Sequence, residues 1–356
     1  MDVWSLPNDS KPDNDTLAML ENRFVTTILP VVYSFVTLIS IPGNLVSLWI
    51  LLFHSKPITS SIILMINLSV TDLVLAIFLP FQIIYHINNN NWIFGKGLCN
   101  VVSVLFYANM YCSILTIMSI SIERYLGIVY PMKSSTWRRK RYAVAASIFI
   151  WIFTLVSLYP MESTDLTYKV SHLNITTCFD VLKWNMLPNL ITWAVFILGL
   201  FFFLFLIPSV VTVFCYIRII WTLVRTSNRS GTGKERRPIS LALIVLFVFV
   251  TCFAPNNFIL MIHTINRLFY NKSYYHAYKL TLTMSCLSSC LDPFLYYFAS
   301  KDFRKKVLEV WSKTFSRDKI FDGRRGSLFS GTFSSGHAEI IENGNDCKYK
   351  LQESDL

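Results

Sequence analysis

Charged residues are scarce in this chain of 356 residues. Asp, Glu, Lys and Arg make up 15% of the sequence, whereas soluble domains carry about 25%. Apolar residues make up 53% and gather in long blocks, such as 28–53 and 239–262. A run of about 20 mainly apolar residues spans the hydrocarbon layer of a membrane as a helix. The low charge and the long blocks therefore exclude a soluble enzyme, a nucleic-acid-binding protein and a disordered scaffold.

The motifs of hydrolytic and metal-dependent enzymes are also missing from the sequence. It contains no G-x-S-x-G, no H-E-x-x-H, no P-loop and no paired Cys/His spacing. The six histidines are scattered over both predicted sides of the membrane. We therefore expect no catalytic residues and no enzymatic activity.

Seven apolar blocks predict seven membrane-spanning helices, which together form a receptor domain over 27–299. Their limits are 27–53, 60–86, 97–129, 142–160, 188–223, 238–265 and 275–299. At 300–314, apolar residues at helical spacing alternate with basic ones, which is typical of a helix lying on the membrane surface. The expected fold is thus an all-α membrane protein, a seven-transmembrane helix bundle with a short amphipathic eighth helix. Residues 1–26 form the N-terminal segment, and the polar residues 315–356 predict a disordered tail.

The distribution of basic residues predicts the orientation and accounts for the net charge of +11. The loops after spans 1, 3 and 5 and the stretch after span 7 hold most of them: Lys56, Lys133, Arg138, Arg139, Lys140, Arg141, Arg225, Arg229, Lys234, Arg236, Arg237, Lys301, Arg304, Lys305, Lys306 and Lys313. The opposite loops hold Lys96, Lys169, Lys183, Arg267 and Lys272. Because basic loops stay in the cytoplasm, the N-terminus is expected outside the plasma membrane and the tail inside. Residues 1–24 lack the apolar core of a cleavable signal peptide, so the first span is expected to direct insertion.

Two kinds of modification site lie in the predicted extracellular segments. Asn8, Asn14, Asn174 and Asn271 each begin an N-x-Ser/Thr sequon and are candidates for glycosylation. Of the eight cysteines, Cys99 and Cys178 alone lie outside, where a disulfide persists. A bridge between them would fasten the loop between spans 4 and 5 onto the third span. The cysteines within the spans are expected to be small apolar packing residues.

Several polar residues interrupt the apolar spans, and their burial in lipid would be costly. They are Asp72, Asn109, Ser113, Ser288 and Asp292. Carboxylate, amide and hydroxyl oxygens together suit a sodium ion, whereas a water-filled polar network without an ion is the alternative. An ion-coupled transporter or channel is a further possibility, but the spans show no second-half repeat of the transporter kind.

Two further features of the spans are weak evidence when taken singly. Glu123-Arg124-Tyr125 ends the third span, where an arginine also reaches lipid headgroups in many membrane proteins. Five prolines lie in different spans and are expected to kink them: Pro80, Pro160, Pro208, Pro255 and Pro293.

In their full order, these residues resemble the rhodopsin-like (class A) G-protein-coupled receptors over residues 25–313. The matching elements are Gly43-Asn44, Leu68–Asp72, Trp92, Cys99, Glu123–Tyr125, Trp151, Pro208 with Tyr216, Cys252–Pro255 and Asp292–Tyr296. Phe253, where many members have Trp, is similar to the purinergic (nucleotide) branch. So are Asn67–Leu73, Phe81-Gln82, Phe106–Tyr111 and Ser300–Phe303.

Two departures from that branch leave the ligand open. Members that bind nucleotides usually have His and Arg or Lys in the outer sixth span, where this chain has Asn257 and Leu260. They also usually tie an N-terminal cysteine to the third outside loop, and neither segment has one here. A nucleotide or purine-like anion therefore competes with an anionic lipid-like or peptide-conjugate ligand acting through the G12/13 class.

The resemblance implies a two-state mechanism, in which a small extracellular ligand shifts the bundle toward a state that admits a heterotrimeric G protein. Span 6 would swing outward at a kink by Pro255. The expected switch residues are Glu123, Arg124, Tyr125, Tyr216, Phe249, Phe253, Pro255, Asp292, Pro293 and Tyr296. The candidate ligand residues are Tyr107, Asn256, Asn257, His263 and Lys279, with Lys183 and Arg267 at the rim. Cationic groups beside aromatic ones suit an anion, although an ordinary polar rim facing water explains them equally well.

The tail carries two short motifs. Arg324-Arg325-Gly326-Ser327 is typical of a basophilic kinase site, with Ser327 as the acceptor. The terminal Ser354-Asp355-Leu356 resembles a PDZ-binding end. A PDZ-domain protein and arrestin are thus further candidate partners, no nucleic acid is expected, and no cofactor besides an allosteric sodium ion.

Overall fold

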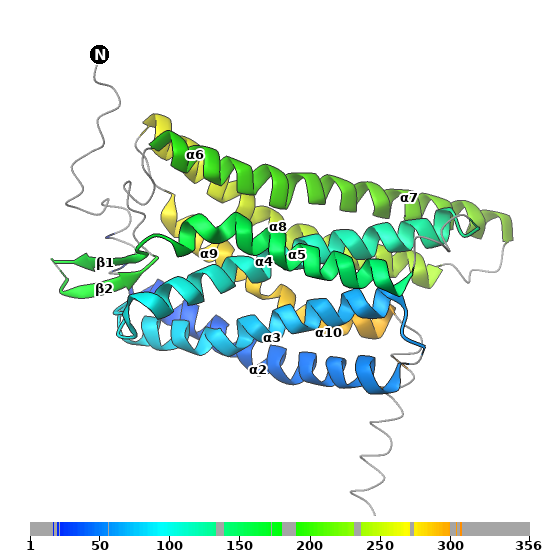
Figure 1. Ribbon diagram of the computed structural model, residues 1–356, viewed down its shortest axis with the longest axis horizontal. Coiled ribbons are helices and arrows are strands. Elements are labelled where there is room, and N and C mark those ends of the chain that lie inside the picture. Colours follow the sequence, from blue (N-terminus) through cyan, green and yellow to red (C-terminus); the bar gives the residue numbers. More distant parts are fainter. Residues whose placement is uncertain are drawn as a thin grey trace, which may run out of the picture. The chain divides into compact units, whose positions relative to one another are not determined.

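The computed structural model describes residues 17, 20, 22–55, 57–132, 139–171, 173–179, 190–230, 236–270, 274–299, 304 and 307. The chain divides into two compact units, 1–307 and 308–356, and all described residues belong to the first. Their elements are α2 (Arg23–Trp49), η1 (Ile50–His54), α3 (Ser60–Ile87), α4 (Gly95–Val129), α5 (Lys140–Glu162), β1 (Thr167–Val170), β2 (Ile175–Cys178), α6 (Leu190–Gly199), η2 (Leu200–Leu206), α7 (Ile207–Ser230), α8 (Arg236–Tyr270), α9 (Tyr275–Cys286) and α10 (Ser288–Ala299). These helices run side by side as a bundle (Figure 1).

The described residues contain six helical segments that are long and apolar enough to cross a membrane. The predicted seventh span is present as α9 and α10, two helices of twelve residues separated by a turn at Leu287. The expectation of a helical bundle is thus confirmed, and the helix of the seventh span is interrupted at Leu287.

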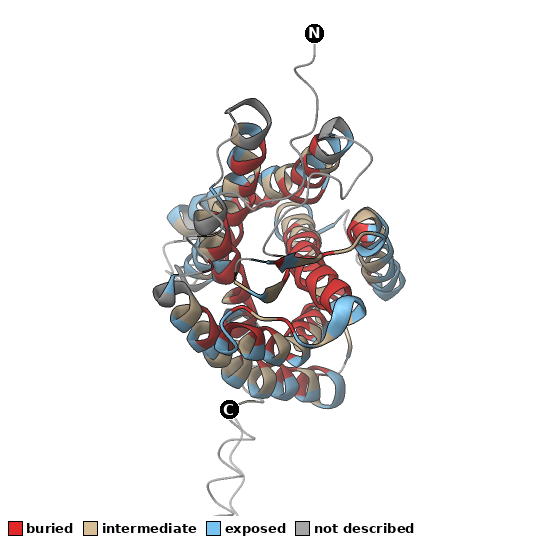
Figure 2. Cartoon of the chain, turned by 90° about the vertical axis from the view of Figure 1, so that its left-hand side faces the viewer, coloured by how far each residue is buried: buried red, intermediate tan, exposed pale blue. Residues whose placement is uncertain are grey.

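The buried residues show which helices lie inside the bundle. The apolar window of α4 is 83% buried, whereas that of α5 is 22% buried and leaves Phe149, Val156 and Tyr159 exposed. Figure 2 looks along the bundle from the end with the two strands, and buried residues line the inward faces of the helices. α4 is therefore the interior helix of the bundle, whereas α5 lies at its periphery.

Hydroxyl and amide side chains compensate for the irregular backbone of the last span. Proline cannot bond to the carbonyl four residues before it, and for Pro293 that carbonyl belongs to Ser289. Asn44 on α2 donates to it instead, over 3.0 Å. A Cβ atom on Gly43 would lie 3.1 Å from Cγ of Pro293. The close packing of α2 against α10 thus explains why a glycine and an asparagine occur at positions 43 and 44.

Proline acts differently in the fifth span. Pro208 follows η2, a π-helical segment, and the amide of Ile207 donates to the carbonyl of Phe202 five residues earlier. Pro208 has no amide hydrogen to donate within the helix. The backbone accommodates this with the wider turn of a π-helical segment. The other predicted kink residues, Pro80, Pro160 and Pro255, lie inside helices that continue past them.

A β-hairpin covers part of the outer end of the bundle and was not predicted. β1 and β2 pair antiparallel, with Thr167 opposite Cys178. The amide of Trp92 extends the pairing by donating to the Thr176 carbonyl over 2.7 Å. Asn100, next to Cys99, donates to the carbonyls of Glu162 and Thr164. The hairpin is therefore fastened to α4 through polar bonds as well as through any covalent bridge.

The predicted disulfide is confirmed. Cys99 and Cys178 are bonded, with a sequence separation of 79 and Cα atoms 5.7 Å apart. The described free cysteines, Cys112, Cys215, Cys252, Cys286 and Cys290, are all buried, as expected of packing residues.

Other predictions fall on residues that the structure does not describe. Of the amphipathic segment 300–314, only Arg304 and Val307 are described, and both are helical. The tail with Ser327 and the sequons at Asn8, Asn14 and Asn271 lie outside the described residues. Asn174 is exposed in the hairpin turn.

Candidate ligand and coupling sites

At the outer end of the bundle, two candidate ligand residues, Tyr107 and His263, meet around Tyr278, which was not predicted from the sequence. Tyr107 on α4 shares a hydroxyl–hydroxyl hydrogen bond with Tyr278 on α9. The ring of His263 on α8 stacks on Tyr278 at 6.4 Å. On the other side of Tyr107, the ring of Phe179 packs edge-on at 5.4 Å. The four rings form an aromatic layer that joins the hairpin, α4, α9 and α8.

Phe179 owes its place in the layer to an unusual backbone. Its φ is +61°, a region that bulky residues rarely enter. The disulfide of Cys178 and the bond from the Phe179 amide to the Leu166 carbonyl (2.9 Å) hold it there. Strained residues of this kind cluster at ligand clamps. Its position directly after Cys178 was the signal that could have found it in the sequence.

Two asparagines form a polar patch next to this layer. Asn256 and Asn257 donate to the sulfur of Met110, over 3.1 and 3.8 Å. Sulfur is a weak acceptor. Both amide oxygens and the Tyr111 hydroxyl are buried without a hydrogen-bond partner in the described part of the structure. Unsatisfied buried groups in a native protein call for an explanation such as a water or ligand.

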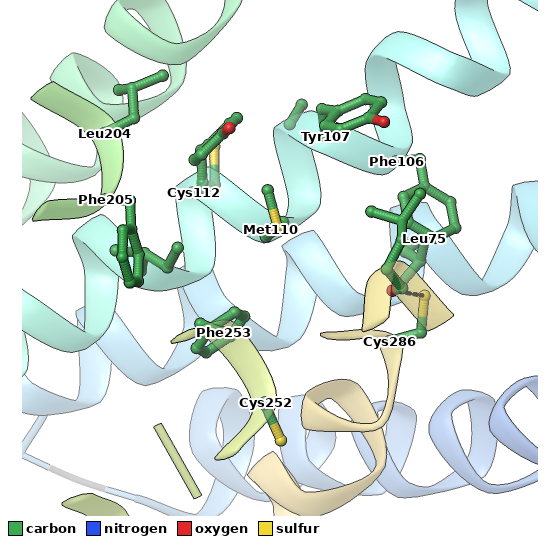
Figure 3. Close-up of a cluster of buried hydrophobic side chains, with 14 of the residues drawn as sticks. Leu75, Phe106, Tyr107, Met110, Cys112, Leu204, Phe205, Cys252, Phe253 and Cys286 are labelled. Carbon is green, nitrogen blue, oxygen red and sulfur yellow. Dashed lines mark hydrogen bonds between the residues drawn. The ribbon is translucent and has the colours of Figure 1, made fainter. Parts of the chain in front are cut away.

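The walls around the asparagines are apolar. Met110 on α4 contacts both asparagines, and Figure 3 shows it between Tyr107 and Phe253 of α8, with Leu204 and Phe205 of η2 to one side. Leu260 on α8 is buried in the same hydrophobic cluster. At the position where nucleotide-binding members carry a cation, this chain therefore has a buried apolar side chain.

Lys279 follows Tyr278 on α9, but it lies on the side of the helix that is near α2. Its side chain is only 5% exposed. One turn further along the same face, the Thr283 hydroxyl pairs with Tyr33 of α2 over 3.2 Å. Lys279 thus lies inside the bundle near α2, rather than at a water-facing rim. Lys183 and the side chain of Arg267 lie outside the described residues.

Three of the polar residues predicted to bind sodium, Asp72, Asn109 and Asp292, come together in the middle of the bundle. Asp72 and Asp292 are fully buried and adjacent, and Asn109 donates to Asp72 over 3.3 Å. In the described structure, both oxygens of Asp292, one of Asp72 and the Ser113 hydroxyl have no hydrogen-bond partner. Ser288 is also buried, and its hydroxyl donates to the Ser285 carbonyl. Two facing carboxyl groups with unused oxygens fit a hard cation.

At the inner end, Glu123 is held by the neighbouring helix. Its two carboxylate oxygens accept hydrogen bonds from Ser60, over 2.8 Å, and from Ser61. Both serines lie in the first turn of α3. Serine is common at the start of a helix, so nothing in the sequence assigned a role to these two. Only the fold places them opposite Glu123.

The remaining switch residues join α4, α7 and α8. Arg124 lies within electrostatic range of the buried Tyr216, whose hydroxyl has no described partner. Tyr216 and Ile219 on α7 pack against Ala242 and Val245 on α8. These contacts hold the inner half of α8 against α7.

Two aromatic pairs complete the predicted switch. The rings of Phe249 and Phe253 lie 5.5 Å apart on α8, one turn before Pro255. Tyr125 lies 6.0 Å from Phe214 of α7. Tyr296 is helical in α10, but its side chain lies outside the described residues.

Comparison with known proteins gives a consistent assignment. The model of the 7 transmembrane receptor (rhodopsin family) matches residues 43–296. A purinoceptor of Gallus gallus, the type 8 member, is 57% identical over 98% of this chain and 99% of its own length. The S-geranylgeranyl-glutathione receptor of Homo sapiens is 56% identical over the same shares. Proteinase-activated receptor 1 of Xenopus laevis is 38% identical over 82% of this chain and 68% of its own length.

These matches confirm the resemblance inferred from the motifs, including the purinergic branch, and decide against an enzyme, transporter or channel. Receptors of this family are multi-pass plasma-membrane proteins that bind an extracellular ligand and activate a heterotrimeric G protein. With the disulfide, the helical bundle and the inner switch residues in place, this chain belongs to the rhodopsin family of seven-transmembrane receptors.

Proposed function

We propose that this receptor responds to an amphiphilic anion, a peptide thioether with a long apolar chain such as S-geranylgeranyl-glutathione. The observation that carries the proposal is that Leu260, a buried apolar side chain, stands at the position where nucleotide-binding members carry a cation. Leu204, Phe205 and Met110 offer contact to an apolar chain. The human relative that is 56% identical is named for this ligand.

A nucleotide is the second candidate, because the Gallus gallus relative is named a purinoceptor. Both ligands are anions, and Lys279, Lys183 and Arg267 are the cations we assign to them. The apolar chain distinguishes the two ligands, since burial contributes about 0.8 kcal/mol for each CH₂ group.

The experiment measures nucleotide exchange on G12/13, Gi and Gq proteins with the receptor in membranes. Geranylgeranyl-glutathione, unmodified glutathione and a nucleoside diphosphate are added separately. We expect a response to the conjugate and none to glutathione. Leu260→Lys should weaken the conjugate response at equal surface expression. A response to the nucleotide alone would overturn the proposal.

We further propose that Asp72 and Asp292, with Asn109, Ser113 and Ser288, hold a sodium ion. Their unused buried oxygens support this. Such an ion would neutralise two adjacent carboxylates. Agonist affinity should then fall as sodium replaces potassium, and Asp72→Asn should abolish that dependence. Unchanged sodium dependence in Asp72→Asn would contradict the assignment.

We infer that the N-terminus is extracellular, as the distribution of basic residues indicates, and that Asn174 is glycosylated. The exposed hairpin turn leaves room for a glycan. Asn174→Gln should increase the electrophoretic mobility of the receptor, and an unchanged band would contradict glycosylation there. Asn8, Asn14 and Asn271 are tested in the same way. Phosphorylation of Ser327 and binding of arrestin and a PDZ-domain protein remain proposals based on the tail sequence.

A further inference from the structure

The exposed face of α7 is apolar along most of its length and becomes aromatic and basic near its inner end. Val210, Phe214 and Ile217 recur at helical spacing and are each more than half exposed, as expected of side chains that face lipid. Trp221 continues this stripe and is 53% exposed. The fifth span begins by Ala194, and about 20 residues cross the hydrocarbon layer. Trp221 therefore lies at the level of the inner headgroups, where tryptophan is common.

Two guanidinium groups gather on this tryptophan. Arg218 lies 5.2 Å and Arg225 5.5 Å from the centroid of the Trp221 ring. Each contact is a cation–π interaction, which also leaves the N–H groups at the edge of the guanidinium available. The buried Nε of Arg218 has no hydrogen-bond partner in the described structure.

No carboxylate explains why these two like charges come together. Neither guanidinium forms a salt bridge within the described residues. The sequence contains no Asp or Glu from 181 to 234, or from 124 to 161. The inner ends of α5 and α7 are therefore cationic without compensation from their own segments, and Glu123 at the inner end of α4 bonds to Ser60 and Ser61.

The neighbouring helix adds hydroxyl groups to the same place. Tyr125 of α4 packs against Phe214 of α7 at 6.0 Å and against Tyr130 at 5.7 Å. Tyr130, which follows α4, is 44% exposed. Phenol groups donate hydrogen bonds to phosphate oxygens. The α4–α7 rim, defined here as Tyr125, Tyr130, Arg218, Trp221 and Arg225, thus combines two cations and two hydroxyls beside a lipid-facing stripe.

We propose that the α4–α7 rim binds the phosphorylated headgroup of an anionic phospholipid of the inner leaflet. Arg218 and Arg225 pair with the phosphates, and the acyl chains lie along Phe214 and Ile217. A membrane lipid rather than a soluble phosphate is the occupant, because the cations adjoin exposed apolar side chains at the headgroup level. An anion between the two guanidiniums removes their mutual repulsion.

The test counts lipids bound to the full-length receptor by native mass spectrometry. The probes are a phosphatidylinositol bisphosphate and, as the neutral reference, phosphatidylcholine. Arg218→Gln/Arg225→Gln should weaken phosphoinositide binding about thirtyfold, which corresponds to roughly 1 kcal/mol for each cation. Trp221→Leu, which stays apolar toward lipid, should weaken it less. Arg218→Lys/Arg225→Lys should retain part of the affinity, since charge remains but the planar stacking is lost.

The matched control removes two charges from another inner helix end. Arg139→Gln/Arg141→Gln on α5 changes the net charge equally, and its two arginines are both exposed. We expect at most about a threefold effect if binding follows site geometry rather than overall charge. An equal loss in both double variants would overturn the proposal. So would equally tight binding of free inositol trisphosphate, which would assign the rim to a soluble phosphate.

Discussion

At the scale of single residues, Glu123 shows how a switch group is held in place by its neighbours. Ser60 and Ser61 supply two hydrogen bonds from α3, and a buried carboxylate that loses such bonds is destabilised by about 1–3 kcal/mol each. These bonds stabilise the arrangement seen here. Any state in which the inner end rearranges has to break or replace them.

Ser60→Ala/Ser61→Ala should therefore raise ligand-independent G-protein activation. The measurement is nucleotide exchange without agonist at matched receptor density. Ser119→Ala is the control, because the Ser119 hydroxyl bonds only to the Leu115 carbonyl in its own helix among the described contacts. Basal exchange equal to that of the unmodified receptor would show that the two serines do not restrain the switch.

Lys279 was expected to face the interior of the bundle from the seventh span, and its burial agrees with that expectation rather than with a rim that faces water. Lys279 is 5% exposed, so its ammonium group would pair with an anionic ligand away from water. Loss of one partner of such a pair lowers the binding free energy by about 2–5 kcal/mol. We expect Lys279→Ala to reduce ligand potency by at least about tenfold. Lys279→Arg should retain more, since the charge is kept.

Potency is measured for both variants at equal surface expression. A lysine that merely met water would give a small, salt-sensitive change. If Lys279→Ala matched the unmodified receptor, Lys279 would be removed from the site and the anionic-ligand proposal weakened.

At the scale of elements, the last span depends on contacts that the amino-acid pattern alone does not reveal. Hydrophobic periodicity predicts that a helix exists, because it depends on local composition. It did not predict the turn at Leu287, the π-helical η2 or the strands β1 and β2. These arise from a missing proline donor, from compensating hydroxyls and from pairing with Trp92, which join residues far apart in sequence.

Asn44→Ala tests one of these long-range contacts. It leaves the Ser289 carbonyl without the donor that replaces the one lacking at Pro293, and should lower the free energy of unfolding by about 1–3 kcal/mol. Thermal unfolding of the purified receptor in detergent measures the effect. Ser47→Ala serves as the comparison, since its hydroxyl bonds to the Gly43 carbonyl within α2. Equal unfolding temperatures for the two variants would contradict the role of Asn44.

The candidate site was predictable in part for similar reasons. The bridge between Cys99 and Cys178 was predictable from their extracellular position in the predicted topology. The buried polar residues were predictable because polar groups are costly to bury in lipid. Tyr278 was not predictable, because aromatic residues are frequent in this chain and only the packing shows which rings meet, and the one signal for Phe179 was its position directly after Cys178. Ring contacts across four elements leave no local pattern in the sequence.

At the scale of the whole molecule, the disulfide joins the outer hairpin to the interior helix α4. Cys99→Ala or Cys178→Ala should strongly reduce surface expression or ligand response, because loss of a native disulfide costs about 2–5 kcal/mol in small domains. The double variant should be no worse than either single one. Cys112→Ala, a free buried cysteine on α4, is the control. Alkylation of both Cys99 and Cys178 in the intact receptor would contradict the bridge.

Coupling between the two ends of the bundle is tested by Arg124→Ala. Arg124 lies within electrostatic range of Tyr216 at the inner end, on the same helix as Tyr107 but about five turns away from it. Ligand binding should be retained, while G-protein activation is largely lost. Radioligand or fluorescent-ligand binding and nucleotide exchange are compared at equal expression. Unchanged exchange would refute the assignment of Arg124 to the switch.

The burial of the free thiols makes the receptor suitable for a simple stability assay. Cys112, Cys215, Cys252, Cys286 and Cys290 are enclosed in the folded bundle, so a thiol-reactive fluorophore should label them only when the helices separate. Replacing Cys347 of the tail by Ser removes a thiol that lies outside the described residues. In that variant, fluorescence during heating would report unfolding through the native thiols, and no cysteine would have to be introduced. Ligands and lipids could then be ranked by how far they delay the signal.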